Sequence, residues 1–131
     1  MRKLFLPAMA LAYAANAQWA EPNINTFVGG PSADLPMMAN GPEGSTYISW
    51  LENAAGAYKV RMQRLDSLGV ALWPANGHVI SAEPQGSALF AHDFTADNAG
   101  NALFAFQDER SGASDLVVYK IGPDGEDLWD G

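Results

Sequence analysis

The sequence predicts an all-β, antiparallel fold, and three observations support this fold class. Short segments rich in aromatic and aliphatic residues, such as STYISWLE at 45–52 and NALFAFQD at 101–108, are typical of β-strands. Turns that contain glycine separate these segments at regular intervals. Beyond residue 17, no apolar pattern follows the 3.6-residue period of an amphipathic helix. The 131 residues suffice for one small domain at most.

Residues 1–17 predict a signal peptide. Two basic residues precede an apolar run at 4–14, which is too short to span a bilayer. Ala15 and Ala17 form the small-x-small pattern that signal peptidase recognises, so we expect cleavage after Ala17. A buried N-terminal helix is the alternative for the same residues. We therefore expect a secreted protein, extracellular or at the cell surface, with the periplasm as another destination that such a signal allows.

The composition is acidic and lacks cysteine. The chain has 7 basic and 15 acidic residues, and removal of residues 1–17 would leave 5 basic and 15 acidic residues, a net charge near −10. Such a chain repels nucleic acid and anionic membrane surfaces, so we expect neither as a partner, and we expect no membrane span. Because no disulfide can form without cysteine, stability has to come from packing or from repetition.

The sequence predicts an internal repeat with a period of 56 residues. This shift superimposes glycine, aromatic and aliphatic positions without a gap. The clearest pairs are Gly44/Gly100, Trp50/Phe106, Gly56/Gly112, Gly69/Gly125, Leu72/Leu128 and Trp73/Trp129. A period of this length is typical of solenoids, propellers and arrays. We interpret 18–33 as a linker or first strand, 34–89 as repeat unit 1 and 90–131 as an incomplete repeat unit 2.

Each unit is expected to contain about four short strands joined by tight turns, which is the content of one β-propeller blade. The expected strands are 45–52, 58–65, 101–108 and 115–121, and the expected turns are 53–57, 66–69, 109–113 and 122–125. Trp73 and Trp129 each follow a hairpin glycine by four residues, where a further strand is expected to start. The segment 101–108 is apolar on both faces, as in a strand buried from both sides. The expected architecture is therefore two propeller-like blades.

Two segments resemble the repeats of secreted bacterial β-propeller proteins: MQRLDSLGVALWPANGHVIS at 62–81 and AFQDERSGASDLVVYKIGPDGEDLW at 105–129. The Asp-x-Arg-x-Gly element of that family is matched in unit 2 by Asp108, Arg110 and Gly112, whereas unit 1 departs from it with Glu52, Asn53 and Ala54. The resemblance covers about residues 30–131. It implies a propeller architecture and export. It implies little about chemistry, because the family is defined by its architecture.

Two blades cannot close a ring, since known propellers need about four to eight. We therefore expect the sequence to be the N-terminal fragment of a longer protein. The alternative is a complete short chain that closes by assembling with copies of itself. The expected partners are accordingly further blades or other copies, with an extracellular polymer or glycan as another candidate. We expect Trp73 to pack against the adjacent blade and Trp129 to be more exposed.

One cluster of oxygen-bearing side chains raises the question of a calcium site. Asp93, Asp97, Asn98 and Asn101 are close in sequence, in an expected loop before the strand at 101–108. Carboxylate and amide oxygens at such spacing could hold Ca²⁺. The order of a known calcium loop is absent, and unit 1 has Met37, Gly41, Pro42 and Ser45 at these positions. An ordinary solvated turn is therefore the preferred interpretation.

Other candidate residues also have a structural interpretation that we prefer. Asp108, Glu109 and Arg110 could form an acid pair beside a cation, but hydrogen bonding in the turn by Asp108 and an ion pair of Arg110 are simpler roles. His78 and His92 do not have the spacing of zinc ligands. Four aromatic residues could stack on sugars if exposed, but their strand positions favour the core: Tyr47, Trp50, Phe104 and Phe106.

The sequence therefore assigns no catalytic, cofactor-binding or metal-ligating residue, and an enzyme is the less favoured class. We expect an extracellular β-propeller repeat segment that acts as a non-enzymatic scaffold or binding module. The alternative is part of a secreted glycan-acting hydrolase whose catalytic residues lie beyond residue 131.

Overall fold

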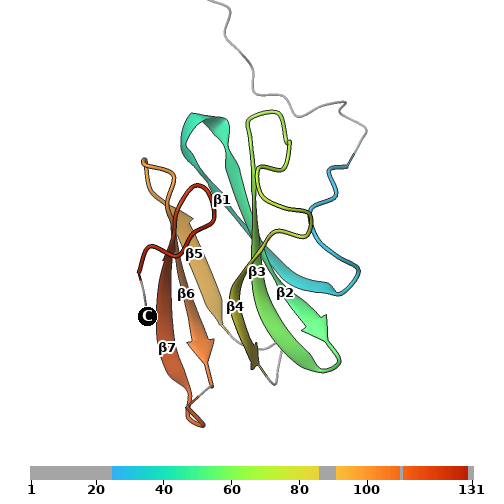
Figure 1. The fold of residues 1–131 in the computed structure, drawn as a ribbon, viewed down its shortest axis with the longest axis vertical. Helices are drawn as coiled ribbons and strands as arrows, with labels where there is room; N and C mark the ends of the chain where they lie inside the picture. The colour runs from blue at the N-terminus through green and yellow to red at the C-terminus, as the bar shows by residue number, and fades with distance from the viewer. Residues whose placement is uncertain (1–24, 86–90, 110, 130–131) are drawn as a thin grey trace, which may run out of the picture.

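The computed structural model describes residues 25–85, 91–109 and 111–129, and this part of the chain is built from two antiparallel β-sheets (Figure 1). The first sheet has the order β1-β2-β3-β4 and the second the order β5-β6-β7. The elements are β1 (Ala33–Asn40), the 3₁₀ turn η1 (Pro42–Gly44), β2 (Thr46–Ala54), β3 (Ala57–Leu65), β4 (His78–Gln85), β5 (His92–Ala96), β6 (Ala102–Asp108) and β7 (Asp115–Ile121). The predicted all-β, antiparallel class is confirmed. The expected signal peptide lies outside the described residues.

The β2–β3 hairpin forms where the sequence predicts it. The two strands pair continuously from Thr46 opposite Leu65 to Ala54 opposite Ala57. The two residues of the turn, Ala55 and Gly56, both have positive φ, as the tightest hairpin turns require. Both strands extend one or two residues beyond the predicted ends, because so short a turn lets the pairing continue to its edge.

The position of Trp73 differs from the prediction. The residue does not begin a strand, since β4 starts only at His78. Gln63 holds the chain at this point: its amide oxygen accepts a hydrogen bond from the Trp73 N–H (3.1 Å), and its amide nitrogen donates to the Pro74 carbonyl (3.0 Å). A turn closed by the Gly77 N–H on the Pro74 carbonyl (2.8 Å) then reverses the chain before β4.

The main hydrophobic core lies between the two sheets, which are seen side by side in Figure 1. Strands from both sheets contribute, so neither sheet buries this surface alone. Its buried members are Tyr47, Leu51, Val60, Met62, Trp73, Ile80, Phe94, Ala102, Phe104, Phe106 and Ile121. Removal of so many large apolar side chains from water is the main favourable term for holding the sheets together.

Three polar contacts join the first sheet to turns of the second. The buried Tyr47 hydroxyl donates to the Gly100 carbonyl (2.5 Å), and burial raises the pKa of Tyr47, which keeps the hydroxyl protonated. The Trp73 indole N–H (2.9 Å) and the Arg64 guanidinium (3.1 Å) both donate to the Pro123 carbonyl. Buried donors and acceptors are costly when unpaired, so these contacts select one placement of the sheets.

Trp73 packs against the neighbouring sheet, as expected. Its side chain is only 6% exposed, whereas Trp129 is 46% exposed. The Trp73 ring also meets the rings of Tyr47 and His78 edge-on, at centroid distances of 5.8 and 5.1 Å. Trp73 thus joins the strands of the first sheet to a turn of the second.

The far face of the first sheet has a smaller core of its own. Ile48, Trp50 and Leu65 are buried there, and Val28 of the preceding segment packs on them. Trp50 is only 2% exposed. Strand β2 is therefore buried on both faces, by the second sheet on one side and by residues near Val28 on the other.

The two sheets contain the same backbone hydrogen bonds at a constant shift of 56 residues. Asp66 N–H to Val70 O (2.9 Å) corresponds to Gly122 N–H to Glu126 O (2.7 Å). Leu72 N–H to Arg64 O (2.8 Å) corresponds to Leu128 N–H to Lys120 O (2.7 Å). Gly41 N–H to Ser45 O (2.8 Å) corresponds to Asp97 N–H to Asn101 O (2.8 Å).

Within the described ranges, no helix is both long enough and apolar enough to cross a membrane.

Candidate functional site

The aromatic residues considered for sugar stacking are buried. Tyr47 and Phe104 have no exposed surface, Phe106 is 1% exposed and Trp50 is 2% exposed. Their expected role in the core is confirmed. A sugar ring cannot reach the aromatic rings between the sheets without separating the sheets, and it cannot reach Trp50 without displacing the segment at Val28. These residues therefore do not form a binding platform.

The four candidate calcium ligands do not converge. Asp93 lies within strand β5 rather than in the expected loop, because β5 pairs with β6 from His92 onwards. Asp97 is in the following turn, where its carboxylate accepts hydrogen bonds from the backbone of Ala99 (2.9 Å) and Asn101 (2.8 Å) and from the Asn101 side chain (2.7 Å). Asn98 is exposed in the same turn. Among the described residues, no three His, Asp or Glu side chains are grouped closely enough to hold a metal ion.

The turn around Asp97 has a testable pH dependence. Hydrogen bonds from the Asn101 side chain and backbone hold the pKa of Asp97 below its ordinary value. A lowered pKa means that the charged form favours folding, so the contribution is present above about pH 4 and is lost as the pH falls through the folded-state pKa. We therefore expect Asp97→Asn to lower the urea midpoint near neutral pH, with a difference from the parent that shrinks towards about pH 2. A difference that stays constant with pH would show that the charge of Asp97 contributes nothing.

The remaining candidates for chemistry are separated from each other. Asp108 is fully buried at the end of β6, whereas Glu109 is exposed, so the two carboxyl groups do not face one common space. Arg110 lies outside the described residues. His78 belongs to the first sheet and meets the Trp73 ring, while His92 belongs to the second sheet and stacks on Phe104 at 5.7 Å.

The most distinctive surface is the face of the second sheet that points away from the first. In β6, buried residues on the inner side alternate with partly exposed residues on the outer side. The strand is therefore buried on one side only, and the prediction of burial from both sides is wrong for it. We call the outer side the open face; by alternation and strand pairing it consists of Asp93, Thr95, Leu103, Ala105, Gln107, Leu116, Val118 and Lys120.

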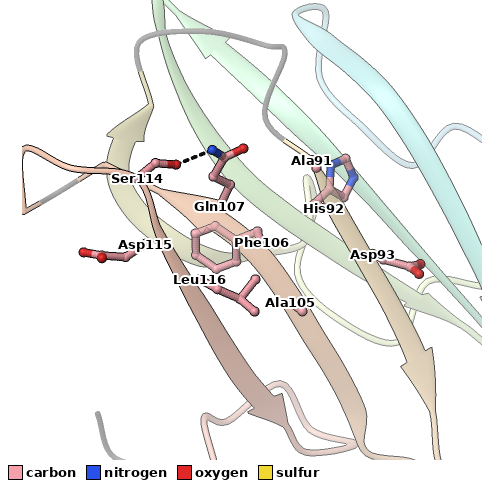
Figure 2. Close-up of a pocket in the computed structure, with 9 residues that line it drawn as sticks. All are labelled: Ala91, His92, Asp93, Ala105, Phe106, Gln107, Ser114, Asp115 and Leu116. Carbon is pink, nitrogen blue, oxygen red and sulfur yellow. Dashed lines mark hydrogen bonds between the residues drawn. The ribbon is translucent and has the colours of Figure 1, made fainter.

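Half of the open face is apolar (Leu103, Ala105, Leu116 and Val118), and the face contains a shallow pocket of about 440 Å³ (Figure 2). Leu116 is 77% exposed and Val118 44% exposed, which is unusual for aliphatic side chains on a strand. The pocket is lined by Ala91, His92, Asp93, Ala105, Phe106, Gln107, Ser114, Asp115 and Leu116. At its edge the Gln107 amide donates to the Ser114 hydroxyl. Asp93 and Asp115 lie on opposite sides of Phe106 and Leu116 in Figure 2, so they do not form a carboxylate pair.

Comparison of the chain with protein-family models, with curated proteins and with solved structures finds no match. Function therefore has to be argued from the geometry alone. That geometry provides an apolar surface with a polar edge, and such a surface is suited to contact with another macromolecule. Sequence reasoning did not single out this surface as a site, although the two-sided apolar character of 101–108 was the signal that could have identified it.

Proposed function

We propose that this chain is an extracellular β-propeller repeat segment that acts as a non-enzymatic scaffold or binding module. The observation that carries the proposal is the constant shift of 56 residues between equivalent hydrogen bonds in the two sheets. Unrelated hairpins would not be expected to have the same backbone bonds at one shift in two separate turns. Repetition of one supersecondary unit is the construction principle of propellers and other arrays.

The backbone conformation of the glycines supports the same proposal. Positive φ recurs at matched positions of the two sheets, where residues other than glycine would be strained. The pairs, with their φ values in degrees, are Gly44 (76) and Gly100 (83), Gly56 (88) and Gly112 (83), and Gly69 (79) and Gly125 (91). Each pair lies in turns that the shift of 56 residues relates. We infer that residues 34–89 and 90–131 are two copies of one unit.

A scaffold role is favoured because several described side chains that were candidates for a site have structural roles instead. The four aromatic side chains considered for sugar stacking are buried, Asp97 closes its own turn, and Gln63 holds the segment at Trp73. The apolar part of the open face has no such role in the described residues, and it suits contact rather than catalysis. An acidic surface and the predicted signal peptide fit an extracellular location.

The proposal can be tested with the purified chain and a panel of extracellular polysaccharides. If the chain binds one of the polymers, we expect the two to co-sediment reversibly. In every case we expect reducing ends to be released only at the background rate. The exposed Glu109 is the one member of the former acid pair that could reach a substrate, so Glu109→Gln is the matched control. Saturable hydrolysis by the parent that Glu109→Gln removes would refute the non-enzymatic role.

A further inference from the structure

The open face of the second sheet corresponds, residue by residue, to a face of the first sheet that is covered. A shift of 56 residues relates Leu116 to Val60 and Val118 to Met62. Val60 is 2% exposed and Met62 has no exposed surface, because the second sheet packs on them. The same positions of the unit are thus buried in one copy and open in the other.

The opposite faces of the two sheets correspond in the same way. Phe104, Phe106 and Ile121, which the second sheet turns towards the first, are equivalent to Ile48, Trp50 and Leu65, which line the far face of the first sheet. The sheets therefore stack head to tail, with the same side of each unit pointing in the same direction. Two units in head-to-tail contact do not close a ring by themselves, so the outward side of the second sheet stays free at the end of the stack.

The polar groups of the existing interface are also partly repeated on the open side. Arg64 and Trp73 of the first unit both donate to the carbonyl of Pro123. Their equivalents in the second unit are Lys120 and Trp129, which both carry N–H donors, and Trp129 is 46% exposed. An occupant that continues the stack would offer a turn carbonyl at the position that Pro123 has in the second unit.

We propose that the open face of the second sheet is a docking surface for a third antiparallel sheet of the same unit, placed in tandem. The inner side of that sheet carries aromatic residues at the positions of Phe104 and Phe106, and its hairpin turn accepts hydrogen bonds from Trp129 and Lys120. The inference rests on the repeat proposed above and adds the partner, the face and the direction of stacking.

A tandem unit fits this surface better than a second copy of the whole chain. In a second copy, the complementary face is the far face of its first sheet, which is already occupied. Val28 packs there, and a β-carbon added at Gly29 would lie 3.2 Å from the Trp50 ring. Head-to-tail docking of whole chains would have to displace this segment. The inner face of a third unit in tandem is not covered by such a segment and can contact the open face directly.

The test uses a chain extended after Gly131 by a second copy of residues 76–131, which preserves the 56-residue period. Because the protein has no cysteine, Leu116→Cys introduces a single thiol on the open face. Leu68→Cys is the matched control, since Leu68 is also exposed (57%) but lies in a turn of the first sheet. The rate of thiol alkylation is measured for both variants in the parent and in the extended chain.

We expect the thiol at position 116 to react at least about tenfold more slowly in the extended chain, because a buried thiol reacts only when the sheets separate. The control at position 68 should react equally fast in both. Equal rates at position 116 in the two chains, including the case in which the added unit stays unfolded, would overturn the proposal. If the thiol at position 116 of the parent chain is protected more strongly at higher protein concentration, the face binds a second copy. If it is protected on addition of a polysaccharide, the face binds a glycan. Either result would also overturn the proposal. None of these results depends on the hydrolysis assay, so the two proposals can fail separately.

Discussion

Trp73→Ala is expected to lower the free energy of unfolding by about 3–5 kcal/mol. The side chain is almost fully buried, it contacts two other aromatic rings, and its indole N–H is the partner of the Pro123 carbonyl. Truncation therefore opens a cavity between the sheets and removes a hydrogen bond from the same place. A loss of this size would remove much of the stability of a small domain.

Trp129→Ala is the matched control, because a shift of 56 residues relates Trp129 to Trp73. Trp129 is 46% exposed, so we expect its replacement to cost only about 1 kcal/mol. Urea unfolding, followed by circular dichroism, gives the free energy of unfolding of both variants. The tryptophan emission maximum should shift to the red for Trp73→Ala only, because that variant loses the more buried ring. Equal costs for the two variants in a monomeric chain would show that the second tryptophan is packed as the first is, which would contradict the proposed open end of the stack.

Local features of the fold could be predicted because they depend on neighbours in the sequence. The β2–β3 hairpin follows from two apolar runs around a turn at Gly56, and the turn at 66–69 follows from its final glycine. The burial of Trp73 could be expected from its recurrence at a fixed distance from that turn. The hairpin and the turn are decided by interactions within a few residues, whereas the burial of Trp73 also depends on the second sheet, where its indole N–H meets the Pro123 carbonyl.

Features that depend on distant residues could not be predicted in this way. Trp73 does not start a strand because Gln63, ten residues earlier, takes up its backbone N–H. Asp93 lies in a strand because β5 pairs with β6, although its local sequence resembles a loop. The sequence of 101–108 correctly indicates two apolar faces, but whether something covers the outer face is decided by what is docked there.

Gly77→Ala is expected to be nearly as disruptive as Trp73→Ala, although it adds a single methyl group. Gly77 has a φ of 66°, in the left-handed region that favours glycine, and an added β-carbon would lie 2.2 Å from the Met62 carbonyl oxygen. That oxygen belongs to the backbone of β3, so relief of the clash requires the turn at 74–77 to move away from the sheet.

Gly56→Ala separates the two causes of this effect. Gly56 also has a positive φ, of 88°, but an added β-carbon would meet no atom within 4 Å. Its replacement should therefore cost only the backbone strain, about 1–2 kcal/mol. Gly77→Ala should cost about 1–3 kcal/mol more, because forced overpacking adds to the same strain. Urea midpoints of the two variants measure the difference directly. If both variants lose the same stability, the turn at 74–77 moves away at no cost, and its contact with β3 does not hold Trp73 in the core.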